Sequence, residues 1–335
     1  MRLIRRVANR AKDYLLFNAS LESYWIDRGR GSITALLYHQ VASSEDGGFL
    51  TRGGSPVITP DAFRRELSFL IARRVRFFTF GQILAGEFPD SSEFGVAICF
   101  DDCFRNNYTT GLTILQELGV PATFFQSTAM VDASELIWEH RLYWHARNPA
   151  SAQALAKLAA EIVPIDARGG PDARKQTIVE WLRESLPMDD CAEVLDAADK
   201  QFGGFAEMRQ IPRSLYPNSE HLRRARSFGH DIGSHGHHHY KRSNISEALF
   251  EQELMQSSTL IESIIRERPT CFSYPFDSHF ASDAEICRRH YSGAATVAKR
   301  RIDDKHDAMW LPRFTWPGPA RNGLRMRRWL LTGQI

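Results

Sequence analysis

The sequence predicts an α/β fold with a parallel β-sheet, and two observations lead to this prediction. Strand-like apolar runs alternate with helix-like segments over residues 33–126, with short connections between them, which is typical of βα units. The run 96–100 is apolar throughout, as expected of a strand buried on both faces. In a barrel of such units, functional residues follow the C-terminal ends of strands. His39 and the pair Asp101-Asp102 stand at such ends.

The composition fits a globular protein and excludes some classes of function. The chain has 335 residues, of which 43% are hydrophobic, enough for one large domain or two small ones. The formal net charge of +2 provides no overall field that would attract nucleic acid, so no nucleic-acid partner is expected. No apolar run is long enough to span a bilayer.

The five cysteines are interpreted as reduced packing residues. Their number is odd and their positions are scattered, which fits a reducing compartment better than a disulfide framework. Cys99 and Cys103 flank the acidic pair, but no second cysteine pair has ligand spacing. Zinc ligation by cysteine is therefore not expected.

Residues 1–30 are interpreted as a basic N-terminal arm. Its first twelve residues contain arginine and lysine but no acid, and they lack the apolar core of a secretory signal. A solvated arm is one interpretation, and a weak peripheral contact with an anionic membrane surface is the other. We expect a cytoplasmic protein, with membrane contact through the basic termini as the alternative.

The rest of the chain, 31–335, is expected to form the α/β domain. A first strand, 33–38, is followed by a loop and by a helix that begins at Thr59-Pro60, with Thr59 as N-cap and proline in the first turn. The helix after Asn106 should end at Gly119. Seven strands are predicted from apolar runs: 33–38, 75–80, 96–100, 120–126, 270–274, 293–297 and 310–315.

A helical insert is predicted at about 131–216, where the strand–helix rhythm stops. Its role is either structural or that of a wall of the substrate groove. Further helices are expected at 218–228, 246–265, 284–291 and 321–331.

Two acids and two histidines form a candidate metal site. Carboxylates such as Asp101 and Asp102 are rarely buried unpaired, and a bound metal ion is one explanation. His235 and His239 are four residues apart, which on a helical turn places both imidazoles on one face. Two histidines and one carboxylate are a common divalent-metal set with open coordination positions. The alternatives are a turn or helix cap for the acids and a surface tract for the histidines.

Four motifs occur in an order that resembles the NodB-type polysaccharide deacetylases, carbohydrate esterase family 4. They are Asp101-Asp102 after an apolar strand, the run 121–125, the segment 230–235 with His239, and the run 272–276. The resemblance extends from about Leu36 to Arg313, apart from the insert. It implies a NodB-like distorted (β/α) barrel with about seven strands, which the helical insert interrupts in this chain. It also implies hydrolysis of an acetyl group, commonly N-acetyl, from a sugar.

The resemblance also implies roles for individual residues. Asp101 corresponds to the general base, and the metal, usually zinc, would be bound by Asp102, His235 and His239. A backbone N–H of the family's Pro-Tyr turn stabilises the oxyanion. The matching turn here is Tyr274-Pro275-Phe276, which we expect to contact substrate. A turn that only packs a strand end is the alternative for Phe276.

The chain departs from the family pattern at three places. Cys103 replaces a glycine, Ser273 stands near the usual base-orienting arginine, and the segment 311–313 has no histidine to act as general acid. His39 is our candidate for the catalytic acid, with a structural role as the alternative. Arg313 either replaces the missing arginine or binds an anionic substrate, and a surface position is the simpler alternative.

The expected function is that of a metal-dependent hydrolase. It removes acetyl groups, N-acetyl in the first place, from a sugar of a polysaccharide, glycolipid or glycan precursor, with a divalent metal such as Zn²⁺ as cofactor. Two alternatives stay open, because a fold does not determine a substrate. One is a non-catalytic glycan-binding protein on the same scaffold, and the other is an amidohydrolase acting on a non-sugar amide.

Overall fold

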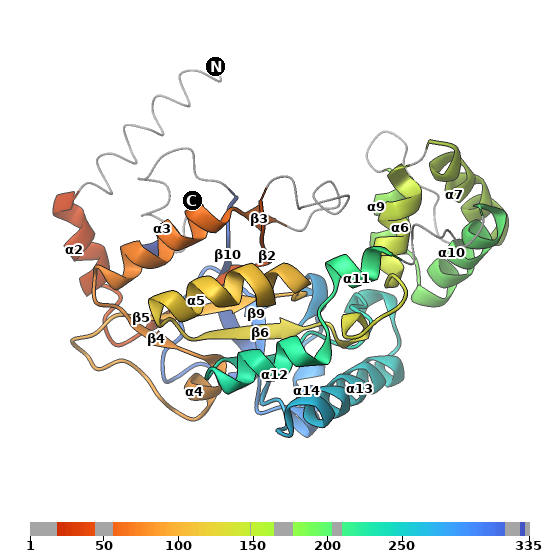
Figure 1. Cartoon of the computed structure of the whole chain (residues 1–335). Coiled ribbons are helices and arrows are strands. Elements are labelled where there is room, and N and C mark those ends of the chain that lie inside the picture. Colours follow the sequence, from red (N-terminus) through yellow and green to blue (C-terminus); the bar gives the residue numbers. More distant parts are fainter. Residues whose placement is uncertain are drawn as a thin grey trace, which may run out of the picture.

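Seven parallel strands form a closed ring, and helices lie around the strands (Figure 1). A computed structural model describes residues 19–43, 56–147, 149–163, 177–202, 210–318 and 329–331. Most of the basic arm, residues 1–18, lies outside the described residues, and so do residues 321–328 of the terminal helix expected at 321–331. The interpretation of these basic segments as membrane contacts therefore stays a prediction.

The ring is closed by β1, which pairs with β10 on one side and with β5 on the other. All of its strand pairings are parallel, which confirms the predicted α/β barrel with about seven strands. The ring strands are β1 (Ile33–Tyr38), β5 (Gly95–Phe100), β6 (Ala122–Gln126), β7 (Asp231–Ser234), β8 (Cys271–Ser273), β9 (Gly293–Val297) and β10 (Leu311–Thr315).

Two strands differ from the sequence-based prediction. The strand predicted at 75–80 is shortened to β4 (Arg76–Phe78), because Thr79 caps α4 (Phe80–Leu84) with a capping box to Gln82. β4 pairs with the first half of β5 while β6 pairs with the second half, so β4 lies outside the ring. The ring instead includes β7, whose four residues contain a single large apolar side chain, Ile232.

Helices cover the outside of the ring, and capping residues in the sequence mark the start of one helix and the end of another. Thr59 caps α3 (Pro60–Ile71) by accepting from the Ala62 N–H, as predicted. α5 (Leu112–Leu118) ends at Gly119, whose φ of 65° is left-handed. The other helices are α2 (Ala19–Asp27), α12 (Ser219–Ser227), α13 (Glu247–Ile265) and α14 (Asp283–His290). Two short strands, β2 (Gln40–Val41) and β3 (Val57–Ile58), form a separate pair.

Alternation along the strands separates an inner core from an outer one. Ala35 and Leu37 of β1, and Ala97 and Cys99 of β5, belong to the apolar cluster enclosed by the ring. Their sequence neighbours in both strands pack against the surrounding helices. Because side chains alternate with a period of two, the next inward positions after these strands are 39 and 101.

The insert between β6 and β7 is helical and has its own apolar core. Its helices are α6 (Trp138–Arg147), α7 (Pro149–Ile162), α9 (Ile178–Ser185), α10 (Met188–Phe202) and α11 (Ile211–Leu215). In Figure 1, α6, α7, α9 and α10 gather in a lobe beside the barrel. Trp138, Leu155, Trp181 and Leu195 are among the buried residues of this core. No helix in the described ranges is long and apolar enough to cross a membrane.

Candidate active site

Inward-facing residues at the ends of five ring strands lie at one pocket or contact the residues that line it. His39 follows β1, Asp101 follows β5 and His235 follows β7, while Ser273 ends β8 and Arg313 lies in β10. All five are inward-facing positions at the same end of the parallel sheet, where the strands of a barrel place functional groups. The resulting cavity measures about 410 Å³, and Asp101, Asp102 and both predicted metal-binding histidines line it.

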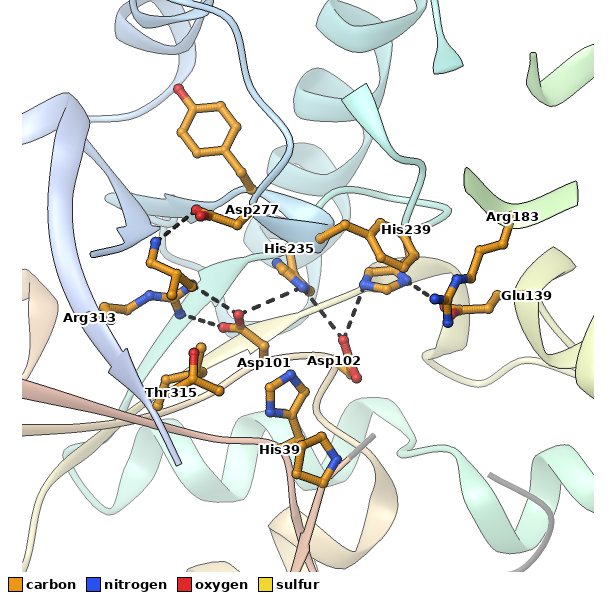
Figure 2. A pocket seen from close by; sticks show the side chains of 15 residues that line it. His39, Asp101, Asp102, Glu139, Arg183, His235, His239, Asp277, Arg313 and Thr315 are labelled. Carbon is orange, nitrogen blue, oxygen red and sulfur yellow. Dashed lines mark hydrogen bonds and ion pairs between the residues drawn. The ribbon is translucent and has the colours of Figure 1, made fainter. Parts of the chain in front are cut away.

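Asp102, His235 and His239 lie together at this pocket. The His239 Nε2 is 3.2 Å from the Asp102 Oδ1, and the His235 Nε2 is 3.5 Å from the same oxygen. One potential ligand atom from each residue lies within 4.8 Å of the other two. Figure 2 shows both imidazoles turned toward Asp102. All three side chains are buried, and their donor types fit a divalent ion such as zinc.

The backbone that brings the two histidines together is a loop. The expectation of a helical turn is wrong, since residues 235–241 after β7 have no regular structure. Gly236 has a φ of 75° and His239 a φ of 63°, and Asp102 is also left-handed with a φ of 62°. A left-handed backbone costs a non-glycine residue roughly 1 kcal/mol or more. Two of the three candidate ligands are therefore held in strained positions.

Glu253 of α13 holds this loop through hydrogen bonds. Its Oε2 accepts hydrogen bonds from the backbone N–H groups of His237 and His238, at 3.0 Å and 2.7 Å. The His238 Nδ1 is 2.7 Å from the Glu253 Oε1. The His237 Nδ1 lies 2.8 Å from the hydroxyl of Thr128. The side chains of His237 and His238 are thus hydrogen-bonded to Thr128 and Glu253, which gives both residues structural roles.

The hydrogen bonds of His235 and His239 leave the Nε2 atom of each ring available. The His235 Nδ1 lies 2.8 Å from the Ser273 carbonyl oxygen, an acceptor, so Nδ1 carries the proton. The His239 Nδ1 lies 3.0 Å from the Glu139 Oε2. Such partners fix the tautomer and orientation of metal-binding histidines. Burial lowers the pKa of His239, but Asp102 and Glu139 outweigh it and raise that pKa to about 10.

Asp101 is held by a buried arginine. The Arg313 Nη1 lies 2.6 Å from the Asp101 Oδ1, and the Nη2 lies 2.9 Å from the Oδ2. Ser273 joins the pair, because its hydroxyl accepts from Arg313 at 2.7 Å and donates to Asp101 at 3.2 Å. Burial raises the pKa of Asp101, but Arg313 and then His235 lower it below the ordinary aspartate value.

This geometry decides between the alternatives for Arg313. The surface alternative is wrong, because the side chain is 1% exposed. Its Nε donates to the Thr296 carbonyl oxygen and its Nη1 also reaches the Cys99 sulfur at 3.9 Å. With these partners added to Asp101 and Ser273, the guanidinium has no donor left for a substrate. The expected substrate contact is therefore replaced by a contact with Asp101, as in the first alternative.

His39 lines the same cavity next to the two acids (Figure 2). Its Nδ1 is buried and, among the described residues, has no hydrogen-bond partner. Its carbonyl oxygen accepts from the Asn107 side chain at 2.6 Å. Burial lowers the pKa of His39, and the raising effect of Asp102 and Asp101 only partly offsets it.

The turn at 274–276 lines the pocket with Tyr274 and Phe276. The Tyr274 ring is buried, stacks on Trp310 at 5.8 Å between ring centroids, and its hydroxyl lies 3.3 Å from the Cys287 sulfur. Tyr274 also lines the pocket, so the substrate contact expected of this turn stays a prediction. Pro275 is buried. Phe276 has a φ of 58°, and its ring centroid lies 4.6 Å from that of His239.

Sequence patterns missed two residues that the insert adds to the pocket. Glu139 of α6 and Arg183 of α9 both line it. Neither belongs to a recognisable motif, and Glu139 meets His239 across 100 positions of sequence. Asp277 was also missed, and its Oδ1 accepts from the Val297 N–H at 2.7 Å.

Comparisons with known proteins agree with this site. The sequence profile of the polysaccharide deacetylase family matches residues 89–163 and 189–289, just over half of the chain. These stretches include the acidic pair, both metal-site histidines and the turn at 274–276. No curated protein sequence matches the chain.

Solved structures of deacetylases share the fold. The deacetylase PplD of Streptococcus pyogenes, in complex with acetate, is 14% identical with a TM-score of 0.53, and the match covers 85% of this chain and 92% of that chain. IcaB from Ammonifex degensii is 16% identical with a TM-score of 0.55, covering 90% and 97%. A polysaccharide deacetylase from Bacillus cereus is 13% identical with a TM-score of 0.56, covering 90% and 69%. At these identities the likeness concerns the fold. Taken with the profile match, it leads to one conclusion: this chain belongs to the polysaccharide deacetylase family, the NodB-type carbohydrate esterases, and is a hydrolase.

Proposed function

We propose that the protein is a metal-dependent deacetylase that hydrolyses an N-acetyl group on a sugar of a polysaccharide, glycolipid or glycan precursor. The observation that carries the proposal is the position of Asp101 beside Asp102, His235 and His239 on one pocket. The His235 Nε2 lies 3.9 Å from the Asp101 Oδ2 and 3.5 Å from the Asp102 Oδ1. A base and a set of metal ligands thus share one wall of the cavity.

The residues present fit a divalent ion, with zinc as the first candidate. Two imidazoles and one carboxylate are typical of catalytic zinc sites and leave positions open. The left-handed backbone at Asp102 and His239 supports this assignment, because such strain is concentrated at functional sites. A bound ion supplies Lewis-acid chemistry there, polarising the acetyl carbonyl and making a water molecule more acidic.

Asp101 is assigned as the general base. Its lowered pKa keeps it ionised at neutral pH, so it is ready to accept a proton from the attacking water. Arg313 and Ser273 fix the carboxylate so that its orientation does not have to be found during the reaction. The water oxygen bonds to the acetyl carbon, the carbon–nitrogen bond breaks, and the products are acetate and a free amine.

His39 is assigned as the general acid that protonates the leaving nitrogen. It lies on the cavity at the end of β1, the strand paired with β5 that carries the base, and the described part of the chain offers its Nδ1 no other partner. The backbone N–H of Phe276 is assigned to the oxyanion of the acetyl group, because this residue lines the cavity beside His239. The structure of the S. pyogenes deacetylase with acetate, the product of such a reaction, supports this substrate class.

The test is acetate release from N-acetylated sugar oligomers by the zinc-loaded protein and by Asp101→Asn. We expect the variant to bind the same amount of zinc and to lose activity by about 10²-fold or more. Simple N-acetyl amides assayed in parallel should not be hydrolysed. Faster hydrolysis of the simple amides would favour the amidohydrolase instead. Sugar binding without acetate release at any metal would favour a glycan-binding protein.

A further inference from the structure

We propose that Glu139 positions His239, so that the helical insert forms part of the metal centre. The inference rests on the proposed function, since it takes His239 to be a metal ligand. It goes beyond that function because it assigns the insert a role in metal binding. A wall of the substrate groove was the only specific role that the sequence suggested for the insert.

The first turn of α6 contacts His239 at two points. The Glu139 Oε2 lies 3.0 Å from the His239 Nδ1 on the side of the ring that faces away from Asp102. The neighbouring Trp138 donates from its indole Nε1 to the His239 carbonyl oxygen at 3.4 Å. Glu139 is 7% exposed and Trp138 is 6% exposed. One helix end thus holds both the ring and the backbone of this left-handed residue.

The insert also fixes the carboxylate of Glu139. Its second oxygen, Oε1, accepts from the Tyr143 hydroxyl at 3.0 Å, one turn further along α6. Arg183 of α9 lies 4.0 Å from the same oxygen and also donates to the Tyr143 hydroxyl. Figure 2 shows Glu139 and Arg183 reaching the site from the insert side, opposite Arg313. One carboxylate oxygen of Glu139 therefore contacts residues of the insert, and the other contacts His239.

The two histidines differ in the charge of their outer partners. His235 is held by a neutral carbonyl oxygen of Ser273, whereas His239 is held by a carboxylate. A carboxylate behind an imidazole raises the basicity of the ring as a ligand, and its loss typically weakens metal binding 10–100-fold. Removing Glu139 should therefore weaken metal binding.

The contact also couples the insert to metal occupancy. Trp138 belongs to the insert core, and Phe276, beside His239, packs against that core. An ion that fixes His239 should thus also fix the first turn of α6. We expect zinc to slow amide hydrogen exchange at residues 138–143, and to slow it less at the distant end of α7.

The experiment measures zinc affinity by competition with a chelating dye, using the full chain. We expect Glu139→Ala to weaken zinc binding 10–100-fold with one site still present, and Glu139→Gln, which keeps an acceptor but no charge, to give a smaller loss. Glu184→Gln is the matched control, because Glu184 pairs with Arg183 and Lys241 of the same region but does not contact His239. Its zinc affinity should equal that of the wild type.

The outcomes separate this inference from the proposed function. Wild-type protein that binds no divalent ion would overturn the metal-dependent deacetylase itself. Wild-type binding with unchanged affinity in Glu139→Ala would overturn only the role of Glu139. If Glu139→Ala does not fold, the exchange experiment on the wild type decides, and equal exchange at 138–143 with and without zinc overturns the inference.

Discussion

Arg313 and Asp101, 212 positions apart in the sequence, form a buried bidentate ion pair, with nitrogen–oxygen distances of 2.6 Å and 2.9 Å. Guanidinium and carboxylate match each other in this geometry, which fixes the orientation of both groups. The motif around Ser273 lacks the arginine that this family often has there. The guanidinium arrives from β10 instead, and Ser273 connects it to Asp101.

Removing this guanidinium should damage both stability and activity. Arg313→Ala leaves a buried carboxylate without its charge partner, which typically costs about 3–5 kcal/mol of unfolding free energy. Urea unfolding of the metal-free protein measures this cost. Arg288→Ala is the control, since Arg288 also contacts both oxygens of an aspartate, Asp307, but is 52% exposed. It should cost less than about 1 kcal/mol. Equal costs for both variants would contradict the buried role.

Removing the two histidine ligands should abolish metal binding. The double variant His235→Ala, His239→Ala leaves a single carboxylate, too few ligands for a tight site. Metal content of the purified chains should fall from about one zinc per chain to none. His237→Ala is the control, because that ring is bound to Thr128 and not to the cluster. A double variant that still holds one ion would place the metal elsewhere.

His39 should be needed for amide substrates and less so for reactive esters. A general acid typically contributes about 10²–10⁴-fold when the leaving group must be protonated. His39→Gln should therefore lose that factor in kcat on an N-acetyl sugar. It should keep most of its activity on an aryl acetate, whose phenolate leaves without a proton. The same loss on both substrates would argue for a structural role of this histidine.

Glu66 gives the fold a pH dependence that is separate from the active site. It is 4% exposed and accepts from the Tyr38 hydroxyl and the Trp316 indole. Burial raises the pKa of Glu66 from 4.5 to about 7, against the lowering effect of these two donors. The folded state therefore binds the proton more tightly than the unfolded state does.

The resulting stability is fully present below about pH 4.5 and is lost as pH rises to about 7. Glu66→Gln imitates the protonated acid, because its amide can donate to Tyr38 and accept from Trp316. Relative to wild type it should be equally stable at pH 4 and more stable at pH 8 by roughly 3 kcal/mol. Urea unfolding across this range measures the difference. Glu117→Gln, at an exposed ion pair with Arg64, should show no such trend.

The sequence predicted the features that depend on local chemistry. The apolar run before Asp101 is buried along its whole length in β5, and Thr59 and Gly119 end helices as their residue types require. Two acids after a buried strand signalled a functional site because burial of unpaired carboxylates is unfavourable. These signals lie within a few residues of the structure that they determine.

Features that depend on distant contacts were missed or misassigned. Glu139 has no periodic or motif signal, because its importance comes from a neighbour 100 positions away. The spacing of His235 and His239 fits a helix as well as a loop. The left-handed conformation of His239 has no sequence signal, because the residue is not a glycine. The packing of the Tyr274 ring on Phe272 and Trp310 likewise has no signal in the local motif.

The pairing of β1 with β10 also sets the time at which the site can exist during synthesis. β10 follows every other ring strand in the chain and carries Arg313. Until it docks, β1 and β9 each present an open edge, and Asp101 has no guanidinium. Such long-range pairings form slowly and expose growing chains to wrong associations. Catalytic competence is therefore acquired in the same late step that seals the barrel, so a ribosome-bound chain that stops before β10 should be both inactive and prone to aggregate.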